Sequence, residues 1–447
     1  MMTTPICDFV RRYAADNPLR LHMPGHKGTG PLGIEALDIT EVSGADSLYE
    51  AAGIIHESEE NASALFGCST FYSTEGSSLA IRAMLYLACL HARDRGTQPL
   101  IWAGRNAHKT FLSAAALLDL DVEWLWPKAN ESYLSCTVDA PSLEQSLQTA
   151  QMLPAAVYLT SPDYLGSVAD ISGIADVCHR YGVLLLVDNA HGAYLKFLPQ
   201  SRHPIDLGAD LCCDSAHKTL PVLTGGAYLH IASTAPAVFT TQAKQALALF
   251  GSTSPSYLIL QSLDAANRAL AETYPAQFAE MAAQADAMKG RLKAHGFTLF
   301  GSEPLKLTLC TKPYGYTGEE LAQRLTEKHI ICEFADPDFL VFMLTPEIGA
   351  AGLNVLEQAL CSIPRKEAVQ TLPPALSVLV RAMRVRQAVF SASETIPAKE
   401  SCGRILSAAT VGCPPAVPIV VCGERISEDA LRCFDYYGIE HCTVIKE

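Results

Sequence analysis

Apolar runs and amphipathic stretches alternate in the middle of the chain. Residues 155–159 and 183–187 are continuous apolar runs, which predict buried strands, and residues 174–181 between them predict a helix. A strand, a helix and a second strand in this order indicate a parallel sheet with helical crossovers. Ligands of such sheets bind at the carboxyl ends of the strands, where Thr160 and Asp188 lie.

The pattern changes after Pro275. Residues 276–295 are rich in Ala, Met and Gln and predict a long helix, which ends at Gly296 and leads to a second domain. The elements expected in that domain are a strand region at 297–311, a helix at 318–328 and a strand at 339–345. Residues 364–374 have the composition of a linker, so a C-terminal domain is expected after them.

Length and composition agree with a cytoplasmic globular enzyme. A chain of 447 residues with 49% hydrophobic content can bury more than one core, and its length suggests about three domains. The net charge is −14 and no basic run occurs, so nucleic-acid binding is not expected. No apolar run approaches the ~18 residues needed to span a bilayer, so no membrane partner is expected.

The fifteen cysteines are odd in number and scattered, without a CxxC pair. This distribution predicts neither a disulfide framework nor a zinc site, and it favours a reducing compartment. Cys212 and Cys213 are expected to pack inside the strand that leads to Lys218. No metal ligand is predicted.

The pair Asp188 and Lys218 carries the strongest chemical signal. An aspartate at the end of a strand can hold a pyridine nitrogen protonated, and a lysine at the end of the next strand can form a Schiff base. Pyridoxal phosphate (PLP) chemistry requires this pair. Most lysines are solvated, however, and an aspartate after a strand is often a turn former, so the interpretation depends on accompanying features.

A candidate phosphate site precedes this pair. Gly76, Ser77 and Ser78 open an apolar helix, where glycine allows close approach, serines supply hydroxyl groups and the first N–H groups favour an anion. Ser215 and His217 stand two residues apart beside the lysine, so they would share one face if the strand stayed regular there. An ordinary capped helix would look much the same.

Between these elements, the run Arg105–Thr110 contains His108, whose imidazole could stack on a bound aromatic ring. With these features the sequence resembles the ornithine/lysine/arginine decarboxylase family of the fold-type I PLP enzymes. The matching stretches, in order, are 21–28, 38–41, 76–78, 105–109, 160–164, 188–192, 215–218 and 252–257. Near the C-terminus, residues 414–418 and 423–424 also resemble segments of that family's extra domain.

The resemblance implies the fold. We expect an α/β, aspartate aminotransferase-like fold with a mostly parallel central sheet, a small α+β domain and a C-terminal α/β domain. The boundaries implied are an N-terminal arm at 1–50, a large PLP-binding domain at 51–285, a small domain at 286–372 and the C-terminal domain at 373–447.

The resemblance also assigns roles. Lys218 would form the Schiff base with PLP, Asp188 would pair with the pyridine nitrogen and His108 would stack on the ring. The remaining cofactor-binding residues would be Gly76, Ser77, Ser78, Thr160, Ala190, Ser215 and His217. Residues 252–257 would contribute to the interface of a homodimer or an assembly of dimers.

The chain departs from the family pattern after Asp188. Several members carry Asp-Glu-Ala-(aromatic)-Gly-Ala-His, whereas this chain has Asn189, His191 and Tyr194 at the differing positions, which alters the surroundings of the ring. The motif at Leu21 leaves twenty residues before it, so an N-terminal wing domain is not expected. The chain therefore resembles the short biosynthetic type, which points to polyamine biosynthesis.

The implied reaction is α-decarboxylation of arginine, lysine or ornithine to its amine, through an external aldimine and a quinonoid. An aminotransferase or lyase reaction, or a non-catalytic PLP-binding role, could use the same residues, and the C-terminal domain favours the decarboxylase. Arginine is slightly preferred as substrate. Glu333, Asp336 and Glu424 are candidate acceptors for a cationic side chain, although most such carboxylates are only solvated.

Overall fold

The computed structural model describes residues 2–127, 135–413 and 417–447. Two compact units can be distinguished, each built from two stretches of chain: Met1–Leu90 with Leu184–Phe278, and His91–Val183 with Ala279–Glu447. These units differ from the domains predicted from the sequence, whose boundaries stay a prediction. Residues 414–416 of the C-terminal resemblance lie outside the described residues.

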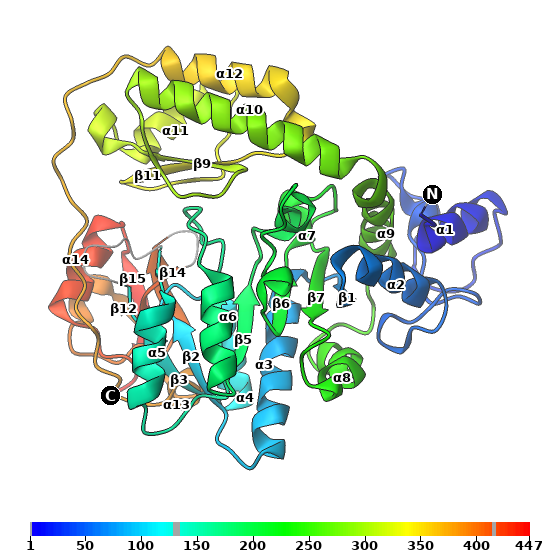
Figure 1. Ribbon diagram of the computed structural model, residues 1–447, viewed down its shortest axis with the longest axis horizontal. Helices are drawn as coiled ribbons and strands as arrows, with labels where there is room; N and C mark the ends of the chain where they lie inside the picture. The colour runs from blue at the N-terminus through cyan, green and yellow to red at the C-terminus, as the bar shows by residue number, and fades with distance from the viewer. Residues whose placement is uncertain (1, 128–134, 414–416) are drawn as a thin grey trace. The chain divides into compact units, whose positions relative to one another are not determined.

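The first unit holds one part of the α/β structure (Figure 1). Its strands are β1 (Ser69–Ser73), β5 (Leu184–Asp188), β6 (Leu211–Asp214) and β7 (Ala227–Ile231), in the spatial order β1-β7-β6-β5. The strands β5 and β6 are parallel, and β7 is antiparallel to both of its neighbours. The helices are α1 (Pro5–Ala15), α2 (Ile54–Phe66), most of α3 (Gly76–Asp94), α7 (Ala216–Thr219), α8 (Ala237–Ala248) and α9 (Tyr257–Glu272).

The second unit begins with three parallel strands and their helices. The strands are β2 (Leu100–Gly104), β3 (Asp121–Leu125) and β4 (Ala156–Thr160), with β2 between the other two. The helices that alternate with them are α4 (Lys109–Leu118), α5 (Ala140–Thr149) and α6 (Ile171–Arg180). Every residue of β2 is buried, as expected for a parallel strand covered on both faces.

The predicted strand–helix–strand unit is confirmed with small shifts. The strands expected at 155–159 and 183–187 are β4 and β5, each displaced by one residue. The helix expected at 174–181 is α6, which begins earlier because the side chain of Asp170 accepts a hydrogen bond from the N–H of Gly173. Cys212 and Cys213 are fully buried in β6, as predicted.

The condition under which Ser215 and His217 would share one face, a regular strand through both residues, is not met. The strand β6 ends at Asp214, and the next residues turn into the short helix α7. The N–H of Lys218 accordingly donates to the carbonyl oxygen of Ser215 at 3.0 Å. Helical geometry replaces the two-residue repeat there, so the side-chain directions of a strand no longer apply.

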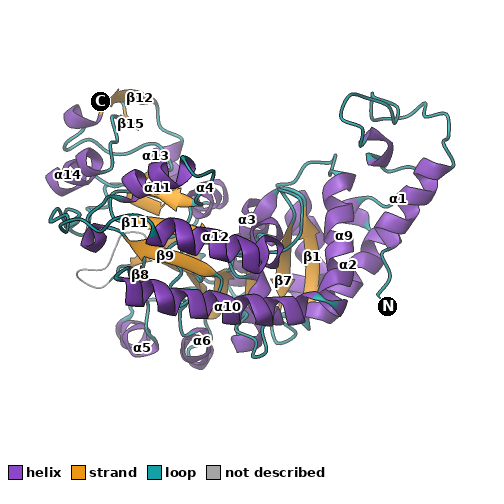
Figure 2. Ribbon diagram, turned by 90° about the horizontal axis from the view of Figure 1, so that it is seen from above, coloured by secondary structure: helices purple, strands orange, loops and turns teal. Residues whose placement is uncertain are grey.

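The second unit continues with a four-stranded antiparallel sheet of order β10-β11-β9-β8. The strands are β8 (Thr298–Phe300), β9 (Lys306–Cys310), β10 (Phe334–Ala335) and β11 (Phe339–Met343), and the helices are most of α10 (Tyr274–His295), α11 (Gly318–Thr326) and α12 (Gly349–Cys361). Figures 1 and 2 show α10 and α12 along one face of this sheet. The long helix, its end at Gly296 with φ +112° and the elements expected beyond it are confirmed.

The C-terminal part also combines strands and helices. β12 (Ser393–Pro397) pairs with β15 (His441–Ile445), and β13 (Thr410–Cys413) pairs with β14 (Val417–Val421), each antiparallel. The helices are α13 (Val385–Val389) and α14 (Glu428–Tyr436). Buried apolar residues of β14, α14 and β15 form its core. Within the described ranges, no helix has the length and apolar character that crossing a membrane requires.

Candidate active site

Lys218 lies in α7, directly after β6. Its Nζ atom is 3.1 Å from Nε2 of His191, and His191 lies in the loop after β5 with 5% of its surface exposed. Two titratable nitrogens at hydrogen-bonding distance can share or exchange a proton. The sequence analysis identified His191 as a difference from the family pattern. Its contact with Lys218 could not be predicted, because it depends on how the loop after β5 folds.

Asp188 is the last residue of β5 and is 2% exposed. Its Oδ1 atom accepts a hydrogen bond from the N–H of Ala190 at 3.2 Å, and the thiol of Cys213 donates to the same oxygen from β6 at 3.6 Å. Because β5 and β6 are parallel neighbours, Asp188 and the start of α7 lie at the same edge of the sheet. The structure therefore brings Asp188 and Lys218 to one edge, as predicted from the strand pattern.

The predicted phosphate segment meets the segment around Lys218. The hydroxyl of Ser215 donates to the hydroxyl of Ser77 at 2.8 Å, although the two residues are far apart in the sequence. Gly76 has φ +70°, which glycine adopts at low cost, and a Cβ atom there would lie 3.9 Å from the ring of His217. Helix α3 begins here, so the N–H groups of its first turn have no partner within the helix.

The chemistry of these donors fits a phosphate group, with two limits set by the structure. The N–H of Gly76 already donates to the carbonyl oxygen of Gly225 at 2.7 Å. The Nδ1 atom of His217 is 2.9 Å from the carbonyl oxygen of Gly226, and burial lowers the pKa of this imidazole. His217 can therefore donate to a phosphate only after it takes up a second proton. The hydroxyl groups and the first turn of α3 provide the other donors.

His108 and Thr160 belong to the second unit. His108 caps α4 after β2, where its Nδ1 atom accepts a hydrogen bond from the N–H of Thr110 at 3.2 Å. Thr160 ends β4, the parallel neighbour of β2, and among the described residues its buried Oγ1 atom has no hydrogen-bond partner. A buried hydroxyl of this kind is suited to a polar ligand atom. The stacking of His108 on a ring stays a prediction.

Glu424, one of the three predicted substrate carboxylates, already has a cationic partner. Its Oε2 atom is 2.9 Å from the guanidinium of Arg105, and both side chains are buried. Arg105 also donates to the carbonyl oxygens of Pro418 and Ile419 and lies over the rings of Trp124 and Trp126. This ion pair ties the run that follows β2 to β14. Because Glu424 is already paired with Arg105, its carboxylate has a partner within the fold and is less suited to bind a cationic substrate.

The other two carboxylates differ in exposure. Glu333 is exposed and accepts a hydrogen bond from the hydroxyl of Tyr164 at 2.7 Å. Asp336 is 2% exposed, and its Oδ1 atom accepts the N–H groups of Asp338 and Phe339. Its Oδ2 atom has no hydrogen-bond partner in the described part of the chain, and burial raises the pKa of Asp336 to about 7. Glu333 is the best placed of the three to reach a ligand from solvent.

The segment predicted for a dimer interface is anchored within its own chain. The N–H of Ser252 donates to Glu75 at 2.6 Å, and Ser256 caps α9. The buried Tyr257 donates through its hydroxyl to the carbonyl oxygen of Asp46 at 2.5 Å. A contribution of this segment to a dimer stays a prediction.

Comparison with known proteins identifies the family. The family model described as "Orn/Lys/Arg decarboxylase, major domain" matches residues 4–296. The arginine decarboxylase of Bacillus subtilis is 30% identical over 463 aligned residues, which cover 95% of this chain and 92% of that protein. The chain belongs to the Orn/Lys/Arg decarboxylase family. It is a PLP-dependent amino acid decarboxylase, as the resemblance implied.

Solved structures of decarboxylases show the same fold. The lysine decarboxylase of Francisella novicida has a TM-score of 0.79 at 16% identity and covers 100% of this chain and 81% of its own. The constitutive lysine decarboxylase of Escherichia coli has a TM-score of 0.77 at 18% identity, with 100% and 82% covered. This likeness confirms the fold-type I prediction for this member of the Orn/Lys/Arg decarboxylase family.

Proposed function

We propose that the chain catalyses the α-decarboxylation of a basic amino acid to its amine, with arginine ahead of lysine and ornithine. The observation that carries the proposal is the position of Lys218 and Asp188 at one edge of a sheet, beside the contact between Ser77 and Ser215. Membership of the decarboxylase family favours loss of CO2 over transfer of the amino group.

Each residue has a task in this proposal. Bound PLP would supply the electron sink for the electron pair that departing CO2 leaves behind. Ser77 and Ser215, with the first turn of α3, would bind the phosphate. Asp188 would hold a proton at the pyridine nitrogen. Lys218, with His191 at 3.1 Å, would hold the proton that Cα takes up after the carboxylate departs.

The relatives and the carboxylates support the proposed order of substrates. The Bacillus subtilis and Bacillus anthracis relatives are both named arginine decarboxylases and align over 92% of their lengths. A guanidinium is best recognised by a carboxylate that can accept two parallel hydrogen bonds. We propose Glu333 for this contact, because Glu424 is paired with Arg105 and the raised pKa of Asp336 disfavours its charged form.

The decisive experiment is a panel of amino acids assayed for released CO2 with the PLP-loaded protein. We expect release from arginine, with slower release from lysine and ornithine. Release from lysine or ornithine alone would overturn the order of substrates. If no basic amino acid releases CO2 while a keto acid accumulates, the reaction is transamination and the decarboxylase proposal is wrong.

The carboxylate assignment has its own test. Glu333→Gln should lower kcat/KM for arginine more than for lysine, because the amide cannot accept both hydrogen bonds of a guanidinium. The matched variant is Glu424→Gln, for which the arginine-to-lysine ratio should stay that of the wild type. An unchanged ratio in Glu333→Gln would remove this residue from the substrate site.

We also propose that the active form is a homodimer or an assembly of dimers in the cytoplasm. Closed symmetric dimers are the commonest oligomers, and the segment 252–257 resembles the family's interface segment. Light scattering should show at least a dimer. A monomer that remains fully active at nanomolar concentration would contradict this proposal.

A further inference from the structure

A second group of polar side chains is buried in the first unit. Cys212 and Asp214 point to the same side of β6, His230 lies on β7, and His203 precedes the 3-10 helix η4 (Pro204–Leu207). All four side chains are fully buried. No short sequence motif contains them, and the cysteine and histidine spacing gave no sign of the group.

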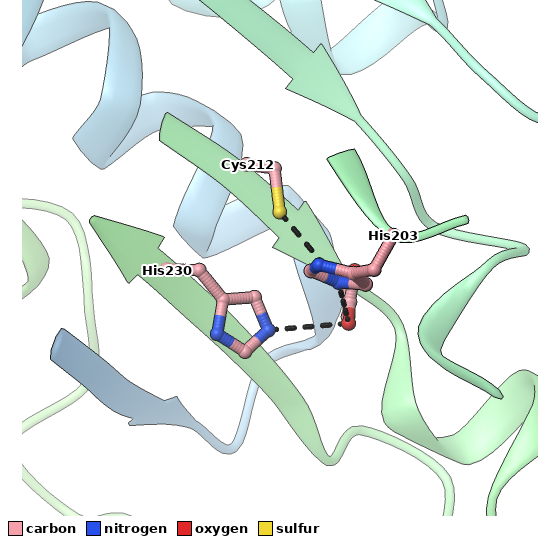
Figure 3. A group of neighbouring side chains, drawn as sticks. His203, Cys212 and His230 are labelled. Atoms are coloured by element: carbon pink, nitrogen blue, oxygen red, sulfur yellow. Dashed lines mark hydrogen bonds and ion pairs between the residues drawn. The ribbon is translucent and has the colours of Figure 1, made fainter. Parts of the chain in front are cut away.

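Asp214 is the centre of this group. Its Oδ2 atom is 3.0 Å from Nε2 of His203 and 3.1 Å from Nε2 of His230. Figure 3 labels both histidines, and the dashed lines from their rings meet at one oxygen. Its Oδ1 atom accepts a hydrogen bond from the side-chain amide of Asn189 at 2.6 Å. The two oxygens of one carboxylate thus meet three nitrogens.

The four ligand-type atoms lie within 4.8 Å of one another, so a metal ion must be weighed against a hydrogen-bonded network. The Nδ1 atom of His203 accepts the N–H of Ile205 at 3.4 Å, so in the neutral ring the proton is on Nε2 and points at Asp214. A metal bound at that Nε2 would need the lone pair instead. The geometry favours the network.

Two members of the network are next to proposed active-site residues in the chain. Asn189 follows Asp188, and Asp214 precedes Ser215 on the way to Lys218. The N–H of Asn189 also donates to the carbonyl oxygen of Cys213 at 3.0 Å. The ends of β5 and β6 are therefore joined by a main-chain and a side-chain hydrogen bond, one residue beyond Asp188 and four before Lys218.

We propose that Asp214 is a positioning residue, which holds Asn189 and so fixes the strand ends that carry Asp188 and Lys218. This inference rests on the proposed function. It explains the departure at Asn189, because the glutamate that several family members carry there would bring a second carboxylate toward Asp214, whereas asparagine supplies a donor.

The charge of Asp214 supports the same role. Burial opposes ionisation, but the two imidazole groups outweigh it and hold the pKa of this carboxyl well below its ordinary value. Burial also lowers the pKa of His230, and its neutral ring can still donate through Nε2. Asp214 therefore remains an anion that accepts from Asn189 over the physiological pH range.

The test is a cycle of variants at the two positions. Asp214→Asn removes the negative charge that both histidines and the Asn189 amide face. Asn189→Ala removes the hydrogen bond to Asp214 and leaves Asp214 with both histidines. Each should lower kcat about 10- to 100-fold with little change in KM, and each should shift the pH titration of the visible absorbance of bound PLP. The exchange variant N189D/D214N restores one donor and one acceptor, so it should regain part of the loss.

The matched control is Asp210, a buried carboxylate at the other end of the same two strands. Its Oδ2 atom accepts the N–H of Leu185 at 2.8 Å, and it lies just before β6. Asp210→Asn should lower the melting temperature of the protein without PLP, yet leave kcat and the cofactor absorbance unchanged. This control separates lost stability from lost positioning.

Three results would overturn the proposal. The first is an Asp214→Asn or Asn189→Ala protein with wild-type kcat and cofactor titration. The second is an exchange variant that regains nothing. The third is one zinc ion per chain, measured by elemental analysis and lost in Asp214→Asn, which would make the group a metal site. If the wild type releases no CO2, the proposed function fails, and the cofactor absorbance still reports on positioning.

Discussion

The polar residues near Lys218 and the carboxylate Glu424 of the second unit differ in the hydrogen-bond partners that they have within the fold. Ser77 and Ser215 contact each other through hydroxyl groups, which can turn toward an incoming phosphate. Glu424 accepts a charged hydrogen bond from the buried Arg105, which cannot be released without leaving a buried charge. The first site can exchange its partners for a ligand, whereas the second pair cannot.

The difference shows how a predicted binding residue should be judged. A buried carboxylate needs compensating partners, so it is stable in a fold when a cation or several N–H groups already bind it. Glu424 has the cation and Asp336 has two N–H groups. The residue type suggested substrate binding for both, but their partners indicate a structural role.

The largest effect is expected from Lys218→Ala. Without the amine no Schiff base can form, so borohydride should no longer fix a pyridoxyl group to the chain and CO2 release should be abolished. Mass spectrometry of the reduced protein checks this. Lys196→Ala is the control, since Lys196 pairs with Asp206 at 2.6 Å in the same unit and should keep both the adduct and the activity. A pyridoxyl group found on another lysine would contradict the assignment.

Asp188→Ala should reduce turnover by about 100-fold or more and still bind PLP. The phosphate contacts survive, while the pyridine nitrogen loses the carboxylate that keeps it protonated. Absorbance of the bound cofactor and CO2 release measure the two effects separately. A wild-type rate in this variant would show that Asp188 does not face the ring.

Glu424→Gln should act on stability rather than on substrate choice. The change leaves Arg105 buried without a counter-charge, which should lower the free energy of unfolding by about 3–5 kcal/mol. Denaturant titration measures this loss. Glu394→Gln is the matched control, because the pair of Glu394 with Arg404 is more exposed and should contribute much less. Equal losses of unfolding free energy in the two variants would show that burial does not make the Glu424–Arg105 pair more important for stability than the Glu394–Arg404 pair.

Asp336 should act only through the pH dependence of the free energy of unfolding. Its pKa is raised from 3.8 to about 7 by burial, so the folded chain holds this proton more tightly than the unfolded chain does. Its contribution to the free energy of unfolding is therefore fully present below pH ~4 and is lost as the pH rises through about 7. The contribution amounts to ~1.4 kcal/mol for each unit by which the pKa is raised.

Asp336→Asn should remove this dependence, because an amide does not titrate. The difference in unfolding free energy between wild type and variant should fall from pH 4 to 7 and then stay level. Chemical denaturation at several pH values measures it. A difference that is constant across this range would show that Asp336 ionises normally in the folded protein.

Much of the framework could be predicted because it depends on local pattern. The strands at 155–159 and 183–187 were placed within one residue, since a continuous apolar run ended by polar residues has one common interpretation in an α/β chain. The end of the long helix before Gly296 was also predicted correctly. Glycine often follows the last residue of a helix because it adopts positive φ at low cost, and Gly296 has a positive φ.

Local pattern failed where the backbone changed its geometry. Ser215 and His217 would share one face of a strand that continued past Asp214, but β6 stops at Asp214 and a helical turn follows. A short turn contains too few residues to establish a hydrophobic period, so nothing in the sequence marked this change.

Local pattern along the sequence was enough to predict the α/β framework, the strand that ends at Asp188 and the residue types suited to PLP. The partners of the buried charged residues became known only from the folded chain. Glu424 finds Arg105 and Asp214 finds Asn189 across long intervals of chain. Such pairs form because packing brings distant segments together, and burial then makes each charge dependent on the partner it meets there.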